Sequence, residues 1–379
     1  MLDTLDTQFR QQHATRAAFF VPGFVIACWA PLVPFAKERA GLNDGTLGMA
    51  LLCLGLGSLI AMPLSGMLAA KYGCRAVMLS MVAMMVLTLP LLALAPTLVT
   101  IGLVLLAFGA AIGAMDCVMN IQAVIVERES GRSMMSGFHA FYSIGSLAGA
   151  TGVTLLLSVG ASALVSTLAV ATGAALVTFL SMRHWRSERA EQPGVAFALP
   201  KGIVVVIGTV CFVSFLSEGS MLDWSAVFLH EVRGVEVLQA GWGFVAFNLA
   251  MTVTRLLGDR MVDRLGHSAA VLVGGLLAAS GFLLATWVPG FELALVGYAL
   301  VGIGCANIVP VMFTLAGRQT RMPEHVAITA VTTMGYAGVL LGPAFIGFVA
   351  QHWSLSGAFV LAAAALAGVA VVGSTLRPR

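Results

Sequence analysis

Charged residues are scarce in this chain. Asp, Glu, Lys and Arg together make up 10% of its 379 residues, whereas a soluble domain carries about 25%. This deficit excludes an ordinary soluble domain. The net charge of +3 is small and gives no indication of nucleic acid as a partner.

Sequence signals for chemistry are absent as well. The chain contains no Walker-type phosphate loop, no HExxH motif and no nucleophile elbow, so we expect neither an enzyme nor an ATP-driven pump. The six cysteines show no CxxC spacing, which predicts no disulfide and no metal site. A glycine pattern at 241–246 matches the dinucleotide fingerprint formally, but no strand precedes it, so we expect no cofactor. Residues 1–16 are polar and lead into a full-length apolar run, which predicts no cleavable signal peptide.

Hydrophobic residues, by contrast, account for 59% of the chain. They form continuous runs, each long enough to cross about 30 Å of hydrocarbon, which takes roughly 20 residues. Barrel strands would alternate between apolar and polar residues, so these runs predict helices. The runs lie near residues 17–36, 46–69, 76–95, 98–126, 134–158, 161–182, 202–229, 238–258, 268–288, 291–316, 325–350 and 353–375. The predicted fold is an all-α membrane protein with 12 transmembrane helices.

Basic residues are concentrated in one set of loops. The loops that join even-numbered to odd-numbered runs hold most of the Lys and Arg residues, as do both termini and the polar segment 183–200. Basic loops of a membrane protein lie on its cytoplasmic side. We therefore expect a multi-pass protein with both termini in the cytoplasm.

The chain also repeats itself. Gly73 and Gly266 each lie in a basic loop and are 193 residues apart. The same offset relates four further pairs: Gly41 and Gly234, Gly109 and Gly302, Gly145 and Gly338, and Gly149 and Gly342. This register predicts two pseudo-symmetric copies of one membrane unit, an architecture typical of transporters. We expect a six-helix bundle at 1–182, a cytoplasmic linker at 183–200 and a second six-helix bundle at 201–379.

Ionisable side chains inside the runs are candidates for function, because a charge in mid-membrane is costly and usually faces a cavity or a partner. Asp116 and Asn120 share one helical face with Gly109 and Gly113, a stripe that can line a polar cavity. Glu218 lies among hydroxyl side chains that can keep a carboxylate hydrated. We expect proton coupling to use three residues: Asp116, Glu218 and His139. The alternative for each is a structural contact, such as a bond from Glu218 to the helix at 325–350.

Polar and aromatic residues in the runs are candidates for binding a solute. Asn307 lies one turn before Pro310, where the proline is expected to break its helix. Asp223 precedes Trp224, and the alternative for that pair is anchoring at the membrane interface. The predicted solute-binding residues are Trp29, Asn120, Tyr142, Asp223, Asn307 and Tyr336.

The two basic loops carry related motifs. They read Gly66-Met-Leu-Ala-Ala-Lys71-Tyr-Gly73 and Asp259-Arg-Met-Val-Asp263-Arg264-Leu-Gly266. This pattern resembles the Gly-x-x-x-Asp-Arg-x-Gly signature of the major facilitator superfamily, although Ala70 replaces the acid in the first copy. We expect the loops to form a conformational latch, in which Arg255 joins the second loop in an ion-pair cluster; a purely structural cluster is the alternative. The predicted latch residues are Gly66, Lys71, Gly73, Arg255, Asp259, Asp263, Arg264 and Gly266.

The resemblance covers nearly the whole chain. The segments 115–120, 138–145, 218–224 and 255–260 resemble a bacterial branch of the superfamily near the fucose-permease-like group. The resemblance implies a monomer in the bacterial cytoplasmic (inner) membrane, a central site lined by helices 1, 4, 7 and 10, and alternating access. Sugar permeases near this branch use acids on helices 1 and 4; here Asp116 supplies the second, but residues 17–36 contain none.

The predicted function is secondary active transport of a small polar organic solute, with protons in symport. One alternative is a proton-coupled exporter of drugs or other hydrophobic compounds. Such antiporters usually carry an arginine in helix 4 and a Gly-Pro pair in helix 5, whereas here helix 4 has no arginine and Ala150 follows Gly149. Another alternative is a membrane enzyme or a sensor on a transporter scaffold. It would need a clustered nucleophile and base or an appended soluble domain, and the sequence shows neither.

Overall fold

The computed structural model describes residues 2–130, 134–187, 200–322 and 324–375. These residues form α-helices and short 3₁₀ helices, and no strand occurs among them. Twelve helical segments are long and apolar enough to cross a membrane. The predicted all-α membrane fold is therefore confirmed.

The first half of the chain contains seven α-helices. They are α1 (Leu2–Ile26), α2 (Val33–Ala40), α3 (Asp44–Tyr72), α4 (Cys74–Leu92), α5 (Leu98–Ser130), α6 (Met135–Ser158) and α7 (Ala163–Ser181). Two 3₁₀ helices accompany them, η1 (Ala30–Leu32) and η2 (Met182–His184). The first apolar run is divided into α1, η1 and α2, because Pro31 and Pro34 have no N–H to continue the helical hydrogen bonds.

The second half contains eight α-helices and a 3₁₀ helix. They are α8 (Ile203–Glu231), η3 (Val237–Gln239), α9 (Trp242–Leu256), α10 (Gly258–Leu265), α11 (His267–Trp287), α12 (Phe291–Cys305), α13 (Ile308–Arg318), α14 (Glu324–His352) and α15 (Leu355–Thr375). The run expected at 291–316 is divided into α12 and α13.

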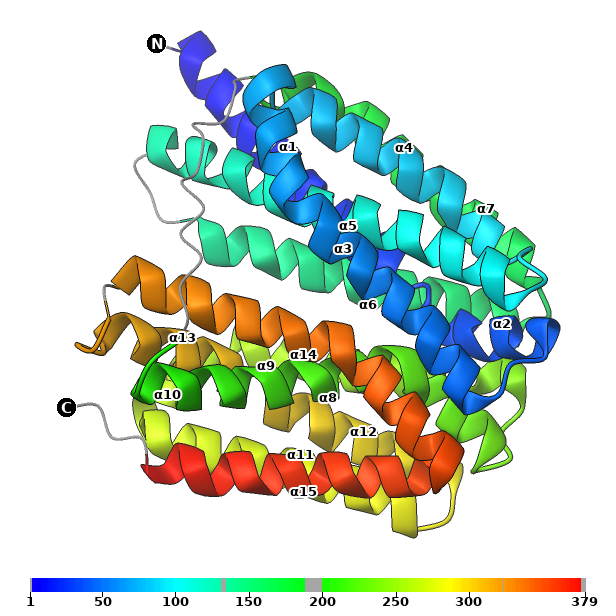
Figure 1. Ribbon diagram of the computed structural model, residues 1–379. Coiled ribbons are helices and arrows are strands. Elements are labelled where there is room, and N and C mark those ends of the chain that lie inside the picture. The colour runs from blue at the N-terminus through cyan, green and yellow to red at the C-terminus, as the bar shows by residue number, and fades with distance from the viewer. Residues whose placement is uncertain (1, 131–133, 188–199, 323, 376–379) are drawn as a thin grey trace. The chain divides into compact units, whose positions relative to one another are not determined.

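The chain forms two compact units. The first comprises Met1–Leu42 and Cys53–Gly194, and the second Asn43–Leu52 and Val195–Arg379. In the first unit α1 packs along α6, and α4 packs against α5 and α7. In the second, α8 lies along α14, and α11 packs against both α12 and α15 (Figure 1). Residues 188–199 of the expected linker lie outside the described residues.

The 193-residue repeat recurs in the packing of the helices. Gly109 on α5 lies against the backbone carbonyl of Leu54 on α3, and Gly302 on α12 lies in the same way against Phe247 on α9. A Cβ atom at either glycine would collide with that carbonyl. Glycine therefore permits backbone-to-backbone contact between membrane helices in each unit. Two further glycines are packed in this manner: Gly145 against Phe20 and Gly338 against Phe212.

Two arginines bind the ends of equivalent helices. Arg39 donates from Nη2 to the Leu92 carbonyl at 2.6 Å, near the last turn of α4. Arg233 donates from Nε to the Ala285 carbonyl at 3.0 Å, near the last turn of α11. The last carbonyls of a helix have no intrahelical donor, so a cation there supplies both a hydrogen bond and favourable charge. The acceptors, Leu92 and Ala285, are again 193 residues apart.

Candidate functional site in the second unit

The site begins at a broken helix. Helix α12 ends at Cys305 and α13 begins at Ile308, and Asn307 between them has φ −108° and ψ −5°. Pro310 has no N–H, so the carbonyl of Ala306, four residues earlier, cannot receive its usual helical hydrogen bond. The break that the sequence predicts near Pro310 thus leaves a backbone acceptor available to another donor.

Arg255 supplies that donor from the last turn of α9. Its Nε donates to the Ala306 carbonyl at 3.5 Å, and its Nη2 donates to Oε2 of Glu218 at 3.2 Å. Glu218 lies on α8, so one guanidinium joins α8, α9 and the α12–α13 break. The Glu218 side chain is 17% exposed and that of Arg255 is 37% exposed. The pair is therefore sheltered but remains within reach of a polar ligand from the side of Arg255.

The second oxygen of the carboxylate is buried without a partner. Oε1 of Glu218 makes no hydrogen bond of good geometry to any described residue, and the same is true of Thr252 Oγ1 on α9. The hydroxyl of Ser214, one turn earlier on α8, lies close to the same carboxylate. A buried polar atom without a partner costs about 1–3 kcal/mol. We refer to Ser214, Glu218, Thr252, Arg255 and the Ala306 carbonyl as the Glu218 site. Its unused acceptors and donors can bind a proton or the polar groups of a solute.

Asn307 borders this site. A Cβ atom at Gly258, the first residue of α10, would collide with Oδ1 of Asn307. The amide side chain therefore lies against the junction of α9 and α10, two residues beyond the end of α9. Asn307 is half-buried, and its position couples the α12–α13 break to that junction.

Comparison with known proteins identifies the scaffold that carries the site. The family model described as Major Facilitator Superfamily matches residues 17–241 and 207–379. The chain belongs to the major facilitator superfamily. An uncharacterized MFS-type transporter of Yersinia pestis is 50% identical over 361 residues, covering 95% of this chain and 94% of that protein. The membrane protein MosC of Rhizobium meliloti is 32% identical, covering 93% of this chain and 88% of the relative.

Solved transporters share the fold of this superfamily member. A crystal structure of the nucleoside transporter NupG has a TM-score of 0.72 at 14% identity and covers 97% of this chain and 98% of that one. The human organic anion transporter MFSD10 has a TM-score of 0.65 at 18% identity, with coverage of 97% and 99%. At these identities the likeness concerns the fold alone. The chain is an MFS transporter and not an enzyme, as the sequence predicts; its place near the fucose-permease-like group stays a prediction.

The latch region of this MFS transporter differs in one contact from the expectation. The sequence predicts that Arg255 pairs within the loop that holds Asp263 and Arg264, whereas its guanidinium contacts Glu218. Side chains in a helix lean toward its N-terminus, which directs Arg255 back along α9 toward α8 and away from the loop. Asp263 and Arg264 are exposed on α10. The side chain of Asp259 lies outside the described part of the chain.

The loop glycines share one backbone geometry. Gly73 has φ +84° and ψ 154°, and Gly266 has φ +78° and ψ 158°, each directly before the following helix. These positive φ values favour glycine. Gly66 is buried on α3, and the ammonium of Lys71 lies 5.0 Å from the centre of the Tyr72 ring. The latch itself stays a prediction.

The polar stripe expected on α5 is used differently. Gly109 packs on Leu54, and Gly113 packs on Ser58, whose Oγ donates to the Gly109 carbonyl at 2.7 Å. The two glycines therefore do not line a cavity as expected; they bring α3 and α5 into contact. Asp116 is half-buried on α5, and Asn120 Nδ2 donates to the Asp116 backbone carbonyl at 2.8 Å.

The other predicted residues are spread over both units. His139 is exposed on α6, with its ring centre 5.1 Å from that of Phe19, and Tyr142 is half-buried on the same helix. Trp29 is completely buried before η1. Asp223 is buried on α8, and Tyr336 on α14 is 37% exposed and stacks on Phe215. Of the predicted site residues that lie far apart in sequence, the structure brings together Glu218, Arg255 and Asn307.

Two side chains of the Glu218 site, Ser214 and Thr252, were not among the predicted site residues. Ser214 precedes Glu218 by four residues and Thr252 precedes Arg255 by three, so each lies next to its charged neighbour on one helical face. That spacing is a signal available in the sequence. The spacing does not indicate that the Ser214–Glu218 face of α8 meets the Thr252–Arg255 face of α9, because that contact depends on how the two helices pack.

Proposed function

We propose that this protein is a secondary active transporter that carries a small polar organic solute across the cytoplasmic membrane by alternating access, with protons in symport. The Glu218 site is the observation that supports the proposal. It combines an ion pair with buried polar atoms that lack partners among the described residues, on two membrane-spanning helices. Ionisable groups at such positions in membrane helices typically belong to substrate or proton pathways.

The ion pair offers a way to couple a proton to a solute. Ionised Glu218 holds the guanidinium of Arg255 at 3.2 Å. Protonation removes the negative charge of Glu218 and, with it, the attraction between the two side chains. Arg255, which is 37% exposed, then directs Nη2 toward an acceptor on the solute. Proton binding thereby favours solute binding, as symport requires.

The remaining contacts belong to the same proposal. Asp116 on α5 is the second proton carrier, in the unit that has no counterpart of the Glu218 pair. Asn307 adjoins the Glu218 site and is the strongest candidate for a solute contact in the second unit. Asn120 is a weaker candidate, because its amide already donates to the Asp116 carbonyl.

The test uses purified protein in proteoliposomes. A thermal-shift screen of sugars, organic acids and amphipathic drugs first identifies a ligand. Uptake of that ligand is then driven by an inward proton gradient while proton entry is recorded with an internal pH dye. We expect Glu218→Gln and Asp116→Asn each to abolish gradient-driven uptake and to retain exchange of solute for solute.

The matched control is Glu292→Gln, an exposed carboxylate in the first turn of α12. This variant should transport like the unmodified protein. The proposal is wrong if gradient-driven uptake is unchanged in both Glu218→Gln and Asp116→Asn. A proton gradient that drives the ligand outward and never inward would instead favour the exporter.

A further inference from the structure

The guanidinium of Arg255 has more donors than the Glu218 site uses. It donates from Nε to the Ala306 carbonyl and from Nη2 to Oε2 of Glu218, whereas a guanidinium carries five N–H groups in a planar fork. Its Nη1 group forms no hydrogen bond to a described residue. Because the side chain is partly exposed, these remaining donors are accessible to a ligand.

The exposed part of Arg255 does not belong to the apolar row of α9. That row consists of Leu249, Val253 and Leu256, which are exposed and lie at i, i+4 and i+7, as expected for a side that contacts lipid. At about 100° per residue, Arg255 lies roughly 120° around the helix from this row. Thr252, three residues earlier and buried, shares its side of the helix. The polar side of α9 is therefore separate from its apolar side.

Protonation of Glu218 leaves a charge to be balanced. While Glu218 is ionised, it neutralises the guanidinium of Arg255. The thiols of Cys211 and Cys305 also lie close to Glu218, and no other titratable group of the described residues interacts with it. Neutral thiols cannot replace a carboxylate beside an arginine. Because an uncompensated charge within a membrane span is costly, Arg255 requires a new negative partner once Glu218 has bound a proton.

A carboxylate on the solute meets this requirement. The position beside Nη2 of Arg255 is occupied by a carboxylate oxygen, that of Glu218, at 3.2 Å, so the site already holds this chemical group. Arginine and carboxylate can pair through two parallel hydrogen bonds. A neutral solute would leave the charge of Arg255 unbalanced, a cationic solute would add to it, and a dianion would bring one negative charge too many.

We infer that the solute is an organic acid with a single ionised carboxylate, which takes the place of the Glu218 carboxylate beside Arg255 when Glu218 is protonated. This inference rests on the proposed function and names the class of solute that its site binds. The proton and the solute are then bound together, because each solute carboxylate needs a neutral Glu218. The hydroxyl of Thr252 and the amide of Asn307 are available for other polar groups of the same molecule.

Pairs of probes that differ at the carboxylate test the class of solute. Binding to purified protein in detergent is measured by calorimetry for L-lactate and L-lactamide, for D-gluconate and D-sorbitol, and for nicotinate and nicotinamide. We expect at least one of the three carboxylates to bind, and to bind at least about tenfold more tightly than its neutral counterpart, in keeping with a charge-assisted hydrogen bond. In Arg255→Gln, this preference for the carboxylate should disappear.

The pH dependence of binding distinguishes competition with Glu218 from a purely structural ion pair. Between about pH 6 and pH 8 the probes stay ionised, and affinity should rise as pH falls, by up to about tenfold per pH unit, because one proton is bound with each solute. In Glu218→Gln the competing carboxylate is absent, so affinity should be high and independent of pH. Arg255→Lys keeps a positive charge beside Glu218 but not the planar fork, and should fold normally and bind weakly.

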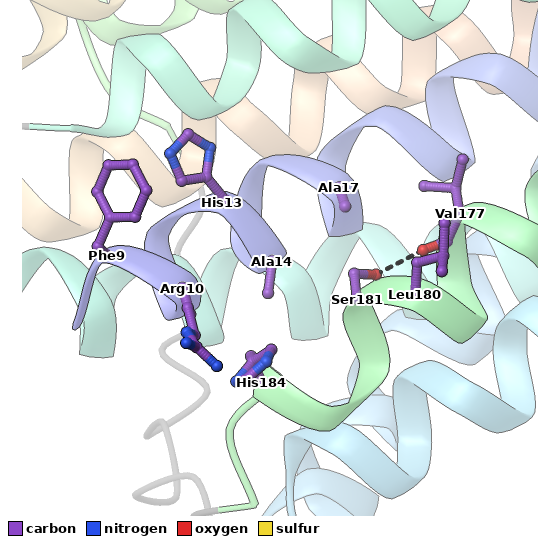
Figure 2. Close-up of a pocket in the computed structure, with 9 residues that line it drawn as sticks. All are labelled: Phe9, Arg10, His13, Ala14, Ala17, Val177, Leu180, Ser181 and His184. Carbon is purple, nitrogen blue, oxygen red and sulfur yellow. Dashed lines mark hydrogen bonds between the residues drawn. The ribbon is translucent and has the colours of Figure 1, made fainter. Parts of the chain in front are cut away.

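The first unit offers a control for anions that bind elsewhere. Arg10 and His184 line a groove between the start of α1 and the end of α7 (Figure 2), and basic side chains attract anions of any kind. Arg10→Gln removes an exposed arginine there and should leave the affinity and its pH dependence unchanged. A loss of affinity in Arg10→Gln equal to that in Arg255→Gln would overturn the inference.

Three further results would overturn it: equal affinity for a carboxylate and its neutral counterpart, no binding of any of the three carboxylates, and a pH dependence that persists in Glu218→Gln. Proton-driven uptake of a neutral solute would refute the inference and leave the proposed function intact. Carboxylate binding that depends on Arg255, without proton-driven uptake of the same probe, would instead refute the proposed function alone.

Discussion

Glu218 and Arg255 form a 3.2 Å ion pair between α8 and α9, and neither residue has a charged counterpart in the first unit. The positions 193 residues earlier are occupied by Val25 and Met62. The glycine contacts and the helix-capping arginines, by contrast, occur in both units. Duplication therefore preserved the packing of the scaffold, while the polar site is specific to the second unit.

The same asymmetry extends to the remaining candidates. Asn307 corresponds to Ala114, and Asp116 in the first unit corresponds to Val309 in the second. Each unit thus carries an acid that the other lacks. In the proposed mechanism these two acids are the proton carriers, and they have different surroundings on a scaffold that is otherwise repeated.

Removing one member of the ion pair should destabilise the protein more than removing both. In Glu218→Gln, Arg255 loses its counter-charge, which we expect to cost about 1–3 kcal/mol; a completely buried pair would lose about 3–5 kcal/mol, and partial exposure of Arg255 lowers that cost. Glu218→Gln/Arg255→Gln should recover most of the loss. Thermal unfolding of the variants measures this coupling. Equal unfolding temperatures for the single and double variants would contradict a stabilising ion pair.

Replacing Pro310 should close the broken helix. Pro310→Ala restores an N–H that can bond to the Ala306 carbonyl, which then no longer needs the guanidinium of Arg255. We expect stability to be retained or raised, because the restored N–H can add a backbone hydrogen bond worth about 0.5–1.5 kcal/mol, and solute exchange to slow about tenfold. Hydrogen exchange of the amides near residue 310 should slow at the same time.

A proline in the first unit provides a matched control for Pro310→Ala. Pro90 lies inside α4 of the first unit, so Pro90→Ala restores a helical N–H away from the Glu218 site. Its transport rate should remain near that of the unmodified protein. Unchanged hydrogen exchange near residue 310 in Pro310→Ala would show that the break does not depend on the proline.

The repeated glycine contacts should be sensitive to a single methyl group. Gly109→Ala and Gly302→Ala each place a Cβ atom against a backbone carbonyl, and overpacking of this kind costs about 1–3 kcal/mol. Gly152 on α6 has no atom within 4 Å of the position of an added Cβ. Gly152→Ala should therefore be neutral or stabilising, since alanine favours a helix. Thermal unfolding distinguishes the three, and similar values for all would refute close packing at the glycines.

Loss of a capping arginine should weaken the end of α11. Arg233→Gln removes the donor to the Ala285 carbonyl, and charge-assisted hydrogen bonds contribute about 1.5–3 kcal/mol. Unfolding temperature and hydrogen exchange at the end of α11 should both report the loss. Arg318→Gln, on an exposed arginine, is the control and should change neither. No difference between these variants would mean that the cap contributes little.

The sequence by itself determined the membrane class, the twelve spans and the two related halves. The number of spans follows from the number and length of the apolar runs, and the repeat follows from the constant spacing between pairs of glycines. Both inferences need only the positions of residues along the sequence. The division of α12 from α13 was predictable for the same reason, because Pro310 acts on the carbonyl of Ala306 within its own helix.

Only the tertiary structure decided which polar residues meet. Proximity in sequence to Asp259 and Asp263 assigns Arg255 to the basic loop, yet its guanidinium contacts Glu218, which lies 37 residues earlier. Gly109 and Gly113 share a face with Asp116, but whether that face meets α3 or a cavity depends on the packing of α5. Partner choice between helices is set by packing and by the cost of leaving a charge unpaired, and neither quantity can be read from the spacing along one helix.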